Sequence, residues 1–150
     1  MREDGQFSNI EAELKTNGVY VSTTAGVSMK PMLRNRRDRV VLLPIGDKVL
    51  KRWNLPIYRR PDGKYILHRV IAVKDDHYVI RGDNTYQKEY VPKEWILGYV
   101  SEFYRGKKHV LADGKGYRFY AALWHRIYFL RVPFHMARRL ASAIKHKIFK

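Results

Sequence analysis

The sequence predicts a mainly β fold: a compact, coiled antiparallel β domain with a short N-terminal helix and a basic C-terminal helical hairpin. Short runs of β-branched and aromatic residues alternate with tight turns from Val19 to about Leu111. From Gly116 onward the pattern changes to apolar residues at helical spacing. The chain has 150 residues, enough for one well-packed core. We therefore expect a β domain over 1–113 and a basic amphipathic helical extension over 114–150.

The first predicted element is a helix over residues 8–17. Ser8 is suited to the N-cap, and Glu11 follows three residues later, which is the pattern of a capping box. Ile10 and Leu14 lie four residues apart, so they are expected to share one buried face.

The predicted strands follow in a series of hairpins. They cover residues 19–24, 40–43, 57–60, 64–73, 78–81, 95–104 and 109–111. Pro61-Asp62-Gly63 is expected to turn tightly into the strand over 64–73. Residues 85–92 are expected to form a polar loop. After the β domain, two helices are expected, separated at Pro133.

The charge balance points to polyanionic partners. Thirty lysines and arginines against fourteen acids give a net charge of +16, and no acid occurs from Gly114 to Lys150. The apolar stripe of the C-terminal helices either packs on the β core or lies in a membrane interface. An anionic membrane surface is the partner that we expect for it.

Several kinds of site and segment are not expected. The chain has no cysteine, so it encodes neither disulfides nor thiolate metal sites. No metal or nucleotide pattern occurs, and we expect no cofactor. No run of about 18 apolar residues predicts a membrane span. Residues 1–6 are not followed by the apolar segment of a signal peptide.

Ser28 has the setting of a nucleophile. It stands between Gly26, which lets the backbone turn, and Pro31, which fixes its own φ, just after a predicted strand. A substrate carbonyl can approach a hydroxyl mounted on such a bend. The alternative is an ordinary polar turn residue.

Two later segments complete a pattern. His68 is the single histidine of the predicted strand over 64–73, and Gly82-Asp83-Asn84 ends the next hairpin. In this order, Ser-Met-x-Pro, His-Arg-Val-Ile and Gly-Asp-Asn resemble the signal peptidase I family, which shares its β-rich catalytic fold with the LexA-type repressors. The resemblance covers roughly residues 19–100.

The resemblance implies a serine peptidase with Ser28 as nucleophile. Most bacterial members use a lysine as the base, whereas His68 is similar to the branch with a histidine in that strand. Neutral imidazole accepts a proton near neutral pH. Asp83 is the first candidate to orient His68, although it can also stabilise a turn. The family has a second acid a few residues beyond Gly-Asp-Asn; this chain has no aspartate at that place, and Glu89 is the residue that could take its role. The backbone N–H of Ser28 is the expected oxyanion donor.

The function implied is that of a serine endopeptidase that cleaves a leader or signal-like peptide. The substrate would bind as an extended strand beside residues 23–26, with small side chains at the cleavage site. Without a membrane span, the chain is expected to lie peripherally on a membrane, on its cytoplasmic side. Two alternatives remain: a basic module that binds a membrane surface or nucleic acid, and an inactive relative. Nucleic acid is the less expected partner, because no helix-turn-helix precedes the β domain.

Overall fold

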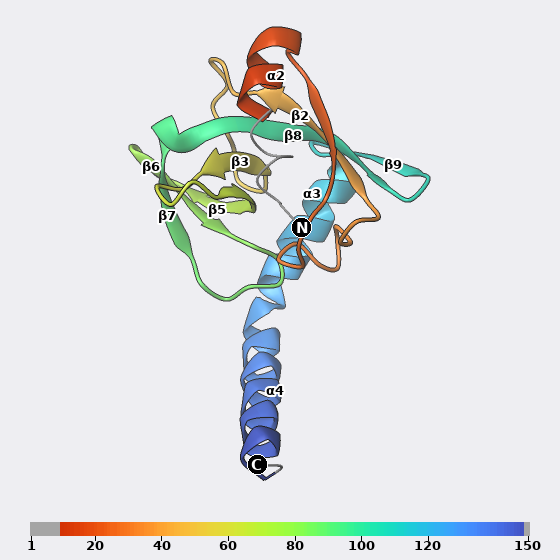
Figure 1. Ribbon diagram of the computed structural model, residues 1–150, viewed down its shortest axis with the longest axis vertical. Helices are drawn as coiled ribbons and strands as arrows, with labels where there is room; N and C mark the ends of the chain where they lie inside the picture. The colour runs from red at the N-terminus through yellow and green to blue at the C-terminus, as the bar shows by residue number, and fades with distance from the viewer. Residues whose placement is uncertain (1–9, 149–150) are drawn as a thin grey trace.

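The protein is a mixed α/β structure built around an antiparallel sheet that curls into a half-barrel (Figure 1). A computed structural model describes residues 10–148. A smaller sheet, a short N-terminal helix and two C-terminal helices complete the fold. The expected antiparallel β domain is therefore present, but mainly β was too narrow a class because the C-terminal helices contain 12 and 21 residues.

The larger sheet has six strands. In spatial order they are β1 (Tyr20–Thr23), β2 (Arg39–Pro44), β8 (Ile96–Arg105), β3 (Pro56–Arg59) and β4 (Tyr65–Leu67), with β9 (Lys108–Leu111) paired to the second half of β8. A 3-10 turn, η1 (Lys93–Trp95), leads into β8. The long strand β8 thus joins the two halves of this sheet, and β1 and β4 form its two ends.

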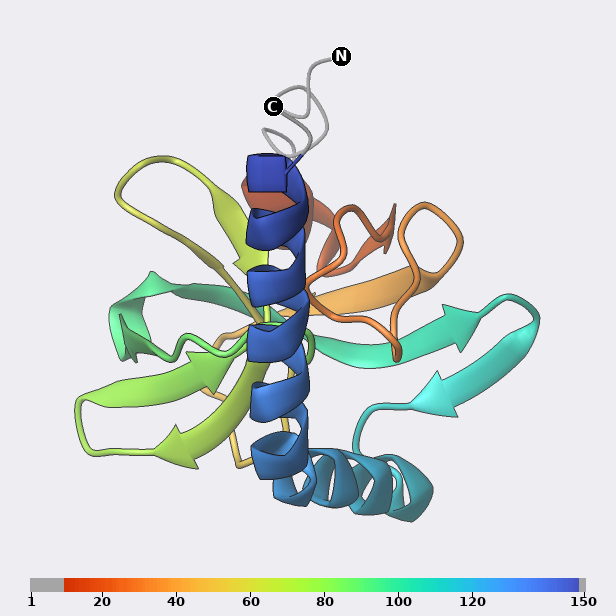
Figure 2. The same cartoon turned by 90° about the horizontal axis from the view of Figure 1, so that it is seen from below.

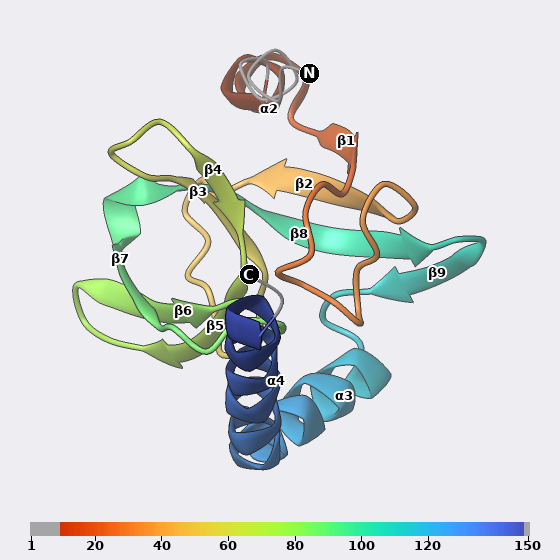
Figure 3. The same ribbon diagram turned by 60° about the horizontal axis from the view of Figure 1, so that its bottom comes forward.

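The smaller sheet consists of three consecutive antiparallel strands. They are β5 (Arg69–Val73), β6 (His77–Arg81) and β7 (Glu89–Pro92). Figure 3 shows this sheet next to β3 and β4, on the side of the half-barrel away from β9.

The strand predicted over 64–73 is interrupted at His68. Its first part, β4, pairs with β3 in the larger sheet, and its second part, β5, pairs with β6 in the smaller one. Just after His68 the backbone also bonds to the segment before β3. Val70 accepts from the N–H of Trp53 at 2.8 Å and donates to the carbonyl of Asn54 at 2.9 Å. His68 therefore lies where the chain crosses from one sheet to the other.

The polar loop predicted over 85–92 is wrong in its second half. Residues 89–92 form β7, with Glu89 opposite Ile80 in β6. Val91 is 1% exposed, whereas the neighbouring Tyr90 faces solvent. An edge strand with one solvated face has polar residues at alternate positions, so its composition resembles that of a loop.

The N-terminal helix α2 (Ile10–Asn17) packs on the half-barrel as expected. Ile10 and Leu14 are both buried in the main hydrophobic core. Gly18 follows with a φ of +69°, a conformation that favours glycine and ends the helix. The predicted cap at Ser8 and the expectation for residues 1–6 lie outside the described residues.

The C-terminal helices are divided at Ile127 and not at Pro133. They are α3 (Lys115–Arg126) and α4 (Tyr128–Ile148), and Pro133 lies inside α4. Contacts at the junction outweigh the proline, since Arg81 contacts both His125 at 3.0 Å and the ring of Tyr128 at 3.5 Å. Pro133 is the sixth residue of α4, so it removes a backbone hydrogen bond from the helix interior, and the helix continues past it.

The two helices have different surroundings. α3 packs on the β core through Tyr117 and Ala121, which are both buried. α4 leads away from the β domain as a long rod and does not fold back along α3 as a hairpin (Figures 1 and 2). Packing on the core, one of the two expectations, therefore holds for α3 and not for α4. Over residues 10–148, no helix combines the length and apolar character that crossing a membrane requires.

Candidate active site

Ser28 lies in the turn that follows β1, as predicted from its flanking residues. Gly26 has a φ of +88°, a conformation that side chains with a Cβ rarely adopt. The turn is closed by a hydrogen bond from the N–H of Lys30 to the carbonyl of Val27 at 3.2 Å, and the N–H of Leu33 donates to Met29 at 3.0 Å. The serine is thus mounted on a defined bend.

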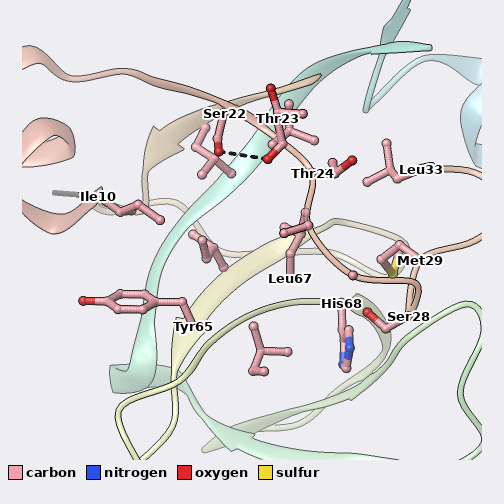
Figure 4. A pocket seen from close by; sticks show the side chains of 16 residues that line it. Ile10, Ser22, Thr23, Thr24, Ser28, Met29, Leu33, Tyr65, Leu67 and His68 are labelled. Carbon is pink, nitrogen blue, oxygen red and sulfur yellow. Dashed lines mark hydrogen bonds between the residues drawn. The ribbon is translucent and has the colours of Figure 1, made fainter. Parts of the chain in front are cut away.

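Ser28 and His68 line the same cavity, which has a volume of about 170 Å³. The Ser28 hydroxyl lies beside the imidazole ring of His68 (Figure 4). Apolar side chains form much of the remaining wall, among them Ile10, Leu33 and Leu67. The two residues that the sequence selects from separate motifs are therefore brought together at one end of an apolar cavity.

The Gly82-Asp83-Asn84 turn holds the Ser28 bend in place. The backbone N–H of Asn84 donates to the carbonyl oxygen of Ser28 at 2.7 Å, and its side-chain amide donates to Val27 at 3.1 Å. A Cβ atom on Gly82 would lie 2.8 Å from the Ser28 carbonyl oxygen and 3.1 Å from Nε2 of His68. Glycine is therefore needed at 82 for the serine bend and the histidine to approach this closely.

Asp83 is bound to Arg69. The Arg69 Nε and Nη2 atoms each donate to a different carboxylate oxygen of Asp83 at 2.7 Å, and both side chains are 3% exposed. The backbone carbonyl of Asp83 also accepts from the indole of Trp124 in α3 at 3.1 Å. Asp83, the first candidate to orient His68, thus has its carboxylate taken up by a buried ion pair.

Glu89 is the carboxylate that faces His68. Its Oε1 lies 3.6 Å from Nδ1 of His68, a buried nitrogen that has no hydrogen-bond partner within the described residues. Arg60 of the preceding hairpin donates to both oxygens of Glu89, through Nε at 3.0 Å and through Nη2. Burial alone would raise the pKa of Glu89, but the hydrogen bonds and charge of Arg60, with the imidazole of His68 close by, lower it to about 2. Glu89 therefore stays ionised beside the imidazole.

Replacing Glu89 by glutamine is expected to change how stability depends on pH. The pKa of Glu89 is depressed in the folded chain, so its ionised form stabilises the fold above about pH 4.5, and this stabilisation is lost as the pH falls toward 2. The free energy of unfolding should therefore differ most between parent and Glu89→Gln near pH 7 and least near pH 2. Urea titrations at several pH values measure this difference.

Glu94→Gln is the matched control, because it removes one exposed carboxylate from the neighbouring turn. It should leave the parent's pH dependence nearly unchanged. A Glu89→Gln difference that stays constant from pH 7 to pH 3 would contradict the assigned charge state.

Sequence reasoning missed two residues of this site, Arg60 and Arg69. Arg69 follows His68 directly and is an arginine within an otherwise apolar run, Val-Ile-Ala-Val. A buried arginine needs an acid nearby, so its position in that run was a signal for a partner such as Asp83. Arg60 carries no comparable signal, because its partner Glu89 lies on a strand that was predicted as a loop.

No group of three or more metal-binding side chains occurs in the described part of the chain. The arrangement instead joins a hydroxyl, an imidazole and a carboxylate, which is the set of groups that general-base activation of a serine requires. Comparison with known proteins adds no assignment. No family model matches the chain, and no curated protein matches it.

Proposed function

We propose that the protein is a serine endopeptidase of the signal peptidase type, with Ser28 as nucleophile and His68 as general base. One observation carries the proposal. Ser28 and His68 come from different motifs and line one cavity, while Nδ1 of His68 faces the ionised Glu89. A structural histidine would need neither an adjacent hydroxyl at a cavity wall nor a carboxylate on its far side.

The reaction would proceed in two halves. Ser28 Oγ attacks the carbonyl carbon of the scissile bond while Nε2 of His68 accepts the hydroxyl proton. The tetrahedral oxyanion is stabilised by the backbone N–H of Ser28, and its collapse expels the amine, which takes the proton from His68. Water then attacks the ester on Ser28, and His68 removes a proton from that water and returns one to Ser28. Glu89 stabilises the imidazolium that forms in each half.

The sheet edge beside Ser28 suits a peptide substrate. β1 lies at one end of the larger sheet and, within residues 10–148, is paired only on its β2 side. Residues 22–26 also line the cavity that contains Ser28. An extended peptide can add to such an edge through main-chain hydrogen bonds and place alternate side chains in the cavity. A volume of about 170 Å³ favours small side chains at the cleaved bond.

Active-site acylation tests the proposal. The purified protein is incubated with a penem, a serine-directed acylating inhibitor, and the adduct is followed by mass spectrometry. We expect one adduct on the parent, none on Ser28→Ala, and acylation of His68→Ala slowed by about 10²- to 10⁴-fold, the usual contribution of a general base.

Ser101→Ala is the matched control, because Ser101 lies on β8 and is not among the residues that line the cavity. It should acylate at nearly the parent rate. A second readout is cleavage of a peptide with alanines flanking the cleaved bond. An adduct that persists in Ser28→Ala, or a parent that neither acylates nor cleaves such peptides, would contradict the proposal.

A further inference from the structure

The long helix α4 exposes a continuous apolar stripe. Six of its large apolar side chains are between 54% and 77% exposed, namely Leu130, Phe134, Met136, Leu140, Ile144 and Ile148. Most of them recur every three or four residues, so they lie along one side of the helix. Leaving such a stripe in water is costly, and large exposed apolar patches mark interaction surfaces.

The opposite side of α4 is basic. Ser142 and Arg139 lie there, and Arg138 and Lys145 lie at its border with the stripe, where Arg138 is over the ring of Phe134 at 5.9 Å. No acid occurs anywhere from Gly114 to Lys150, whereas this segment has nine lysines and arginines. The helix therefore combines an apolar face with an uncompensated positive charge.

This combination favours lipid over other partners. Pairing of α4 with a second copy would cover the apolar stripes but leave the cations of both helices without acids to balance them. A nucleic acid would engage the basic side and leave the apolar stripe in water. An anionic membrane surface satisfies both sides at once, because acyl chains cover the apolar face and headgroups neutralise the cations. We propose that α4 lies in the interface of an anionic membrane.

α4 is also tied to the loop beside the candidate active site. The hydroxyl of Tyr128 donates to the backbone carbonyl of Tyr86 at 2.8 Å, and Arg139 donates to the Tyr86 hydroxyl. Neighbouring residues of that loop, Thr85 and Gln87, line a depression together with His68 and Glu89. A membrane-bound α4 would hold the site close to the lipid. This consequence rests on the proposed function and points to peptides presented at a membrane surface as substrates.

Vesicle sedimentation tests the lipid interaction with the full chain. The probes are vesicles of phosphatidylcholine alone and of phosphatidylcholine mixed with phosphatidylglycerol. The parent should bind the anionic vesicles, bind the neutral ones more weakly, and lose affinity as salt is raised. Leu140→Glu should lower the affinity for anionic vesicles by about tenfold or more, because it puts a charge on the apolar face.

Ser142→Glu is the matched control, because it introduces a glutamate, as Leu140→Glu does, but on the basic side of the same helix. It should lower the affinity much less than Leu140→Glu does. Equal losses in the two variants, or a parent that does not bind anionic vesicles, would overturn the proposal. A parent dimer that Leu140→Glu converts to a monomer would overturn it in favour of self-association.

The lipid proposal and the peptidase proposal can fail separately. Ser28→Ala should bind vesicles as the parent does, and Leu140→Glu should be acylated by a soluble penem at the parent rate. If Leu140→Glu loses lipid binding while the parent shows no acylation, the membrane proposal stands and the peptidase proposal falls.

Discussion

Replacing Asp83 by alanine is expected to destabilise the fold by about 3–5 kcal/mol, because it leaves the charge of Arg69 buried without its carboxylate. The remaining partners of Arg69 are the hydroxyl of Tyr117 at 2.6 Å and the sulfur of Met32 at 3.1 Å, and neither carries a balancing charge. Urea unfolding followed by circular dichroism measures the loss.

Two further variants make this result specific. Asp76→Ala removes a carboxylate that is 88% exposed and should change stability by less than about 0.5 kcal/mol. Combining Asp83→Leu with Arg69→Met removes both charges and should recover much of the stability, as expected for buried ion pairs replaced by apolar residues. If Asp83→Ala keeps the parent's stability but is acylated far more slowly, Asp83 orients His68 after all.

Gly82→Ala is expected to slow acylation of Ser28 by about a hundredfold, the typical cost of misplacing reacting groups by about 1 Å. The added methyl would meet the Ser28 carbonyl oxygen at 2.8 Å, a distance that forces the bend or the histidine to move. Overpacking of this kind costs about 1–3 kcal/mol, so the protein should still fold. The acylation rate and the unfolding free energy, measured on the same preparation, separate the two effects.

The control for this change is Gly116→Ala. Gly116 lies within α3, and a Cβ atom there would meet nothing within 4 Å. This variant should be acylated at the parent rate and be slightly more stable, because alanine is the better helix former. A parent-like acylation rate in Gly82→Ala would show that the close approach around residue 82 does not position the reacting groups.

Much of the candidate site can be predicted from the conformational preferences of individual residues. Gly26 and Pro31 predict the bend that holds Ser28, because positive φ and fixed φ are properties of those residue types. The hairpins around residues 61–63 and 74–77 follow from turn residues between β-rich runs, and the structure confirms both.

The side chains that Asp83 and Glu89 contact could not be predicted from local sequence. Asp83 and Glu89 both lie after His68, and spacing alone could not say which one faces it. That choice depends on the crossing between sheets at His68 and on the pairing of β7 with β6, which are contacts between distant segments. Local propensity carries little information about such pairings.

For the C-terminal helices, too, the sequence determines one property and the tertiary structure determines another. Periodicity and charge alone establish an amphipathic basic segment, because the spacing of apolar residues is a property of the chain. Tertiary structure alone decides that α3 buries its apolar side on the core while α4 exposes its own, since both carry a comparable stripe. The physical reason is which helix reaches the core: Tyr117 packs against Phe103 of β8 and Ala121 is buried in the same core, whereas α4 leads away from the β domain.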